Sequence, residues 1–97
     1  MNIDHLREHI DKIDQCIVSL LNARAAAARD ISLLKAAAGL PVRDSVREGQ
    51  VLRSVTARSK GAMDPAGMSR IYEQILAESR AAQEQAIDEL RLAGVLQ

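Results

Sequence analysis

The chain has 97 residues, and its 13 basic side chains balance its 13 acidic ones. This balance excludes the long-range electric field on which binders of nucleic acid or anionic membranes rely. No apolar run reaches the roughly 20 residues of a membrane-spanning helix, and residues 1–9 are too polar for a signal peptide, so we expect a cytoplasmic protein. A chain this short forms one domain and buries only about two-thirds of its unfolded surface, which favours association with a second subunit.

The first predicted element is a helix from about Asp4 to Ala38, with Asn2 or Asp4 as its cap and Gly39 at its end. At 1.5 Å per residue it is about 50 Å long, which is more than one small domain needs. We therefore expect half of its apolar stripe to pack on another chain. Positions spaced alternately four and three apart form that stripe, in which Arg24 is the exception among Leu6, Ile10, Ile13, Ile17, Leu20, Ala27, Ile31, Leu34 and Ala38.

The second predicted helix follows Pro41, which blocks continuation of the first. It begins at Asp44 or Ser45 and runs to about Ser59. Ser45 and Glu48 have the spacing of a capping box. If this helix packs on the first helix, either Arg47 or Glu48 must lean toward the interior.

The third predicted helix has a strong start signal, in which Asp64 is the cap and Pro65 occupies the first turn. Met63 and Met68 are placed to form a hydrophobic staple across this start. Gly94 marks the expected end. The apolar stripe of this helix contains Met68, Tyr72, Ile75, Ser79, Ala82, Ala86 and Leu90.

A site for a small anion is predicted from the position of Arg24. An arginine on the apolar stripe of a helix costs several kcal/mol in order of magnitude unless an anion or a carboxylate meets it. Lys35 points within about 20° of the same direction, roughly 16 Å further along the axis. Ser79 and Gln83 can present neutral hydrogen-bonding groups to the same interior.

Arg7 does not fit a site within one chain, because it lies about 25 Å from Arg24 and roughly 100° around the helix. If two long helices pair antiparallel across a twofold axis, however, Arg7 can enter the site of the partner chain. Other interpretations of these polar residues stay open. Arg24 could pair with a glutamate, and Lys35 could interact favourably with the C-terminal end of the helix dipole. Ser79 could be a polar residue that is tolerated at the edge of a helix face.

His5 and His9 have a spacing that can bind metal, but no third ligand is evident, so we predict surface histidines and no metal site. Cys16 has no second cysteine to pair with, and we interpret it as a small filler on the helix.

Several short motifs keep a spacing that is typical of one family: Leu6-Arg7-Glu8, Ile10, Ile13-Asp14, Arg24, Lys35, Pro41-Val42-Arg43-Asp44, Arg47-Glu48, Glu78-Ser79 and Gln83. With these residues the chain resembles the all-helical chorismate mutase family over about residues 4–84 of its single domain. The resemblance implies an all-α fold with three helices per chain, in an interlaced homodimer. It also implies conversion of chorismate to prephenate, a step of aromatic amino acid biosynthesis, with no cofactor and two equivalent sites.

Carried over by position, the resemblance implies that Arg24 and the partner's Arg7 hold the two carboxylates of the substrate. Ser79 would lie near the carboxylate on the ring. Lys35 and Gln83 would address the ether oxygen, on which negative charge grows as the carbon–oxygen bond breaks. A rearrangement of this kind needs cations that fix a folded dianion and no reactive nucleophile, which agrees with the residue types present.

The resemblance further implies that Glu48 and the backbone at Asp44 hold the ring hydroxyl, while Arg47 organises that wall. Ala25 and Gly49 depart from the family pattern, although neither removes a proposed ligand contact. Residues 85–97 extend beyond the matching segment and are assigned no function.

Two other functions stay open from the sequence. One is a lyase that releases pyruvate from isochorismate, or a mutase on an amino-substituted chorismate, because the clamp for two carboxylates would be shared. The other is a non-catalytic helical dimerisation or regulatory module, whose interior polar groups only fix the register of the helices. A further enzyme of the same pathway is a possible partner that the sequence does not identify.

Overall fold

The computed structural model describes residues 2–96. It contains three helices, α1 (Ile3–Ala37), α2 (Ser45–Arg58) and α3 (Pro65–Leu92), and no strand within that range. The all-α class and the order of three helices are therefore confirmed, with boundaries close to the predicted ones. Within residues 2–96 no helix is both long and apolar enough to span a membrane.

The ends of α1 and α3 follow the predicted signals. Asn2 caps α1, since its side-chain oxygen accepts a hydrogen bond from the His5 backbone N–H at 2.9 Å. Asp64 caps α3 in the same way, through the Gly67 N–H at 2.6 Å. Gly39 and Gly94, just past the two C-terminal ends, have φ angles of +70° and +77°. This left-handed conformation is inexpensive only for glycine, so both residues turn the chain away from the helix axis.

The start of α2 differs in one detail from the capping box that the sequence predicts. Asp44 is the cap and accepts from the Arg47 backbone N–H at 2.9 Å, while Ser45 is the first helical residue. The Glu48 carboxylate does not return to the helix start, because it pairs with Arg80 of α3. The interpretation of Ser45 and Glu48 as a capping box is therefore wrong.

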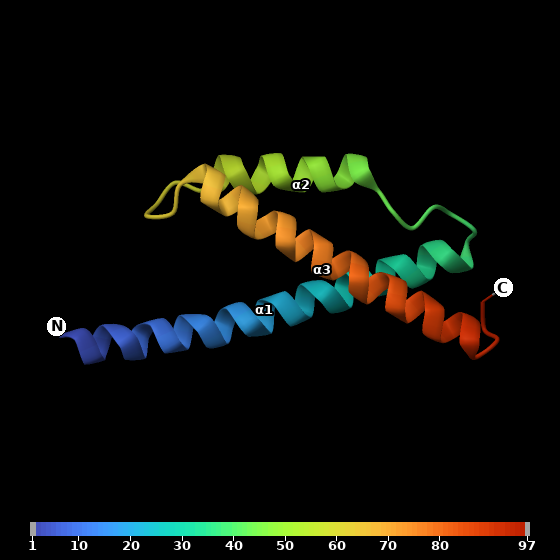
Figure 1. Ribbon diagram of the computed structural model, residues 1–97, viewed down its shortest axis with the longest axis horizontal. Coiled ribbons are helices and arrows are strands. Elements are labelled where there is room, and N and C mark those ends of the chain that lie inside the picture. The colour runs from blue at the N-terminus through green and yellow to red at the C-terminus, as the bar shows by residue number, and fades with distance from the viewer. Residues whose placement is uncertain (1, 97) are drawn as a thin grey trace.

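Helices α1 and α2 both pack against α3. In Figure 1, α3 starts beside the end of α2, diverges from it and crosses α1. It contacts both helices, whereas α1 and α2 do not contact each other within the described residues. The condition considered from the sequence, that the second helix packs on the first, is therefore not met. Because α3 lies between the other two helices, it contributes side chains to every contact between helices in residues 2–96.

A face of small residues on α1 packs against α3. Ala25 and Ala28 are half-buried, and Ser32 is completely buried, with its hydroxyl donating to the Arg29 carbonyl oxygen at 2.6 Å. Small side chains at this spacing let the two helices approach closely. Arg24 lies at the edge of this face. It is partly buried.

The predicted apolar stripe of α1 is exposed in the single chain. Its large residues Leu6, Ile10, Ile13, Ile17, Leu20, Ile31 and Leu34 are all exposed, Leu34 to 73%. Cys16 is also exposed and therefore fills no space within its own chain. Within residues 2–96, α2 and α3 therefore leave this stripe uncovered.

The chain is extended, with dimensions of 58 × 26 × 14 Å and a radius of gyration of 17.0 Å. A compact domain of this length would have a radius of gyration of about 12.5 Å. The N-terminal half of α1 diverges from α2 and α3 (Figure 1). Among the described apolar residues, only Leu76, Ala86 and Ile87 are buried, and all three belong to α3.

Candidate functional site

A cavity of about 310 Å³ lies where the C-terminal half of α1, the start of α2 and the middle of α3 converge. The loop between α1 and α2 closes one side of it. All the predicted site residues except Arg7 line this cavity, namely Arg24, Lys35, Asp44, Arg47, Glu48, Ser79 and Gln83. The fold thus brings together side chains that are up to 59 positions apart in the sequence, between Arg24 and Gln83.

The cavity has a strongly positive lining. Arg24, Lys35, Arg43, Arg47 and Arg80 face Asp44 and Glu48, which leaves a surplus of three positive charges. The chain as a whole is neutral, so this charge is a local feature of the cavity. Charge concentrated in a partly enclosed space attracts small anions more strongly than the same charge spread over a surface.

Two hydrogen bonds fasten α1 to α3 at the floor of the cavity. The Arg24 guanidinium donates from Nη1 to Ser79 Oγ at 2.9 Å, and Gln83 Nε2 donates to the Ala28 carbonyl oxygen at 2.9 Å. Ser79 is buried and Gln83 half-buried. A guanidinium has five N–H donors and an amide nitrogen has two, so both side chains retain donors for a ligand.

Lys35 and Asp44 connect the end of α1 to the start of α2. The Lys35 Nζ atom lies 3.9 Å from Asp44 Oδ2, while Asp44 Oδ1 caps α2. One carboxylate thereby fixes both the beginning of a helix and the direction of the ammonium group. An ammonium has three N–H donors, so Lys35 can hold Asp44 and still address a ligand oxygen.

Glu48 faces the cavity from α2 and forms an ion pair with Arg80 of α3. Its side chain is 21% exposed and that of Arg80 is 32% exposed, so the pair is partly shielded from solvent. Arg80 was not among the predicted site residues, because its role depends on the packing of α2 against α3. A signal was present, since Arg80 follows Ser79 directly and lies three residues before Gln83, on an adjacent face of the same helix.

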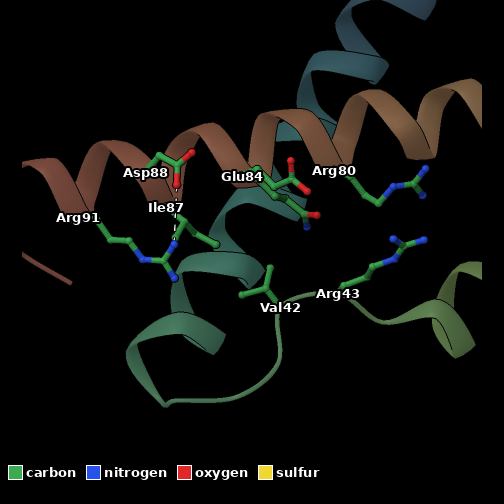
Figure 2. A pocket seen from close by; sticks show the side chains of 8 residues that line it. Val42, Arg43, Arg80, Glu84, Ile87, Asp88 and Arg91 are labelled. Carbon is green, nitrogen blue, oxygen red and sulfur yellow. Dashed lines mark ion pairs between the residues drawn. The ribbon is translucent and has the colours of Figure 1, made fainter. Parts of the chain in front are cut away.

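Arg43 also lines the cavity and was noted in the sequence only as part of a motif. It is exposed on the α1–α2 loop, and Figure 2 shows its guanidinium directed toward that of Arg80. Both arginines also line a neighbouring groove of about 340 Å³ along the C-terminal half of α3. The cavity and the groove therefore share a wall of two cations.

Arg7 lies outside this cavity. It is exposed on the N-terminal half of α1, the part of the helix that diverges from α2 and α3 (Figure 1). This agrees with the expectation that one helix cannot bring Arg7 and Arg24 to the same small ligand. A contribution from Arg7 to a site requires a second chain.

Residues 6–84 match the family described as Chorismate mutase type II. The chain is 32% identical over 78 residues to the bifunctional chorismate mutase/prephenate dehydratase of Aquifex aeolicus, covering 76% of this chain and 22% of that protein. It is 50% identical over 48 residues to a 3-dehydroquinate dehydratase of Pyrobaculum aerophilum, covering 50% of this chain and 16% of that protein. The chain thus spans less than a quarter of the length of these curated relatives.

A solved structure of chorismate mutase from Thermus thermophilus superposes on this chain with a TM-score of 0.81. The two sequences are 28% identical, and the match covers 84% of this chain and 93% of the other. The family match includes every residue that lines the charged cavity. On this evidence the chain belongs to the chorismate mutase type II family.

Proposed function

We propose that this chain is a chorismate mutase, an isomerase that rearranges chorismate to prephenate in the synthesis of phenylalanine and tyrosine. The observation that carries the proposal is the convergence of Arg24, Lys35 and Gln83 from two helices on one positively charged cavity. The rearrangement is intramolecular and concerted, so it requires a folded substrate and stabilised charge rather than a nucleophile. The family membership of the chain supports the same activity.

The first role is the capture of two carboxylates. Arg24 points into the cavity and is held by Ser79, so its guanidinium is oriented before a ligand arrives. A guanidinium binds a carboxylate through two parallel hydrogen bonds, which fixes the direction of the anion as well as its position. We assign Arg24 and Ser79 to the carboxylate on the ring side, and the partner's Arg7 to the second carboxylate.

The second role is stabilisation of the charge that develops on the ether oxygen. As the carbon–oxygen bond breaks, electron density grows on that oxygen, and donors already aimed at it bind the transition state more strongly than the substrate. Lys35 supplies a positive charge for this purpose, and Gln83 supplies a neutral donor. Their contacts with Asp44 and Ala28 limit the motion of both side chains.

The third role is recognition of the ring hydroxyl. Glu48 is the acidic side chain that α2 contributes to the cavity, and its carboxylate can accept a hydrogen bond from a hydroxyl. The backbone at Asp44 is the second group assigned to this hydroxyl. Arg47 directly precedes Glu48 in the same wall of the cavity and adds a positive charge there.

A homodimer completes the proposal. The exposed apolar stripe on α1 is long and regular, and a single chain leaves it in water at a cost of about 25 cal/mol for each square ångström. A second copy of α1 paired antiparallel would cover this stripe and bring the N-terminal half of one helix near the middle of the other. Arg7 of the partner subunit would then reach the cavity that contains Arg24.

Mixing two inactive variants tests the shared site. Arg7→Ala and Arg24→Ala chains are each expected to be inactive, whereas dimers that contain one of each have one intact site. Random association then restores about a quarter of the wild-type sites. The matched control mixes Arg24→Ala with Lys35→Ala, which should stay inactive because both residues act in the same chain. Equal behaviour of the two mixtures would exclude the assignment of Arg7.

The activity itself is tested by incubating the chain with chorismate and identifying the product. Prephenate is expected, at a rate that falls steeply in Lys35→Ala and stays unchanged in Lys60→Ala, which removes an exposed lysine outside the cavity. Release of pyruvate would instead identify a lyase of the same fold. Absence of any product would favour a non-catalytic helical module. The cytoplasmic location expected from the sequence stays a prediction.

A further inference from the structure

The C-terminal part of α3 extends past the segment that matches the family, which ends at residue 84. Ala86 and Ile87 lie in this extension and are only 6% and 5% exposed. They are two of the three buried apolar residues among residues 2–96. A segment that contributes no lining to the charged cavity therefore supplies much of the limited core of the chain.

The extension packs against the loop between α1 and α2, here defined as residues 38–44. Ile87 and Val42 line the same groove, and Figure 2 shows their side chains directed toward each other from α3 and from the loop. Past the end of α3, Gly94 turns the chain back, and the Val95 N–H donates to the Leu90 carbonyl oxygen at 2.9 Å. Leu96 then lines a second cavity together with Gly39 and Leu40 of the loop.

The loop has little packing apart from this groove. Within residues 37–47, Val42 is the one residue that is not exposed. Two positions later the loop supplies Asp44, which caps α2 and pairs with Lys35 at 3.9 Å. Val42, which faces Ile87 in the groove, is therefore two positions from a residue that sets the geometry of one end of the cavity.

We infer that Ile87 is a positioning residue, which holds the α1–α2 loop through Val42 and thereby keeps Asp44 and Lys35 in place for the reaction. The inference about the reaction rests on the proposed function. Ile87 does not line the charged cavity, and Arg24 and Ser79 are fastened to each other at the opposite end of it. Loss of the Ile87 side chain should therefore disturb the end that addresses the breaking bond and leave the carboxylate clamp intact. Misplacement by about 1 Å can cost as much as 100-fold in rate.

The test compares Ile87→Ala with Leu92→Ala, which lies in the same extension but is 89% exposed. Ile87→Ala is expected to lower kcat on the order of tenfold while KM changes little, and Ile87→Val should recover most of the loss. Leu92→Ala should retain wild-type kcat and KM. Equal kcat values for Ile87→Ala and Leu92→Ala, or a loss carried by KM alone, would overturn the inference.

Hydrogen exchange at residues 38–44 provides a readout that does not depend on activity. Exchange in the loop should accelerate in Ile87→Ala and stay unchanged in Leu92→Ala, relative to exchange in the middle of α1. Should Ile87→Ala fail to fold, Val42→Ala removes the same contact from the other side, with the same expected outcome. If wild-type protein forms no prephenate, the proposed function fails, while loop exchange still decides whether Ile87 holds the loop. Unchanged loop exchange in both variants would refute the positioning role.

Discussion

Arg24 and Ser79, 55 residues apart in the sequence, are joined by a hydrogen bond of 2.9 Å from the guanidinium Nη1 to the serine Oγ. This bond links the middle of α1 to the middle of α3 at the floor of the charged cavity. It orients the guanidinium of Arg24, the residue that interrupts the apolar stripe of α1. Orientation before binding reduces the entropy that a ligand must lose on binding, so the serine contributes even without touching the substrate.

Ser79→Ala should therefore weaken the reaction without abolishing it. A hydrogen bond to a charged group that is partly exposed contributes about 1 kcal/mol, which corresponds to about a fivefold fall in kcat/KM. Steady-state kinetics on chorismate measure this change. Ser54→Ala, on the exposed side of α2, is the matched control and should keep the wild-type value. A Ser79→Ala variant with unchanged kcat/KM would show that Arg24 needs no orienting partner.

Because Arg80 of α3 and Glu48 of α2 form an ion pair, we expect their substitutions to have non-additive effects on kcat/KM. Arg80→Met keeps most of the length of the side chain but leaves the Glu48 carboxylate without its partner. We expect each single variant, Arg80→Met and Glu48→Gln, to lower kcat/KM, and the double variant to lose less than the sum of both losses. A double-mutant cycle measures this coupling, which we expect to be about 1 kcal/mol. If the two losses in kcat/KM simply add, the ion pair does not contribute to the reaction.

The amide of Gln83 predicts a rate that depends little on pH between about 6 and 8, because an amide donates a hydrogen bond at any ordinary pH. Gln83→Glu should change this behaviour. An ionised carboxylate would repel the negative charge growing on the ether oxygen, and only the protonated form donates. Since the reference pKa of a glutamate is about 4.3, activity of the variant should rise as pH falls. A pH profile of kcat for both proteins distinguishes them, and a flat profile for Gln83→Glu would place Gln83 away from the reacting oxygen.

Replacing Gly49 or Gly39 by alanine should change the stability of the protein in opposite directions. Gly49 is inside α2, and a Cβ there would meet only the flexible end of Arg53 at 3.3 Å, so Gly49→Ala should stabilise the protein by about 0.5–1 kcal/mol. Gly39 has a φ of +70°, and Gly39→Ala should destabilise it by about 1 kcal/mol. Thermal unfolding at fixed protein concentration measures both changes. Shifts of the same sign would contradict the backbone conformations described here.

The order and the ends of the helices could be predicted from the sequence because the signals are local. Asp64 and Pro65 at the start of α3, and Gly39 after α1, each act on the backbone within one turn. The cations of the site were also predictable in part. Arg24 and Lys35 share one helix, and their relative direction follows from helix geometry alone.

The packing partners of the helices could not be predicted in the same way. α1 has two faces suited to packing, and the face of Ala28 and Ser32, on which α3 packs, has no large apolar residue to indicate it. Nothing in the sequence placed α2 against α3, and Arg80 matters only because of that contact. The role of Val42 and Ile87 depends on a contact across the loop that no local pattern indicates.

Binding of a dicarboxylate that is fixed in the folded shape of the rearranging substrate is the most direct test of the central claim. Calorimetric titration of the full chain with such a bicyclic compound should show one molecule bound per chain. Affinity should fall about tenfold or more in Arg24→Ala, because a charged hydrogen-bonding partner is lost, and stay unchanged in Arg58→Ala, which removes an exposed arginine outside the cavity. No binding by the wild-type chain, or equal binding by both variants, would contradict the assignment of the cavity as a dianion site.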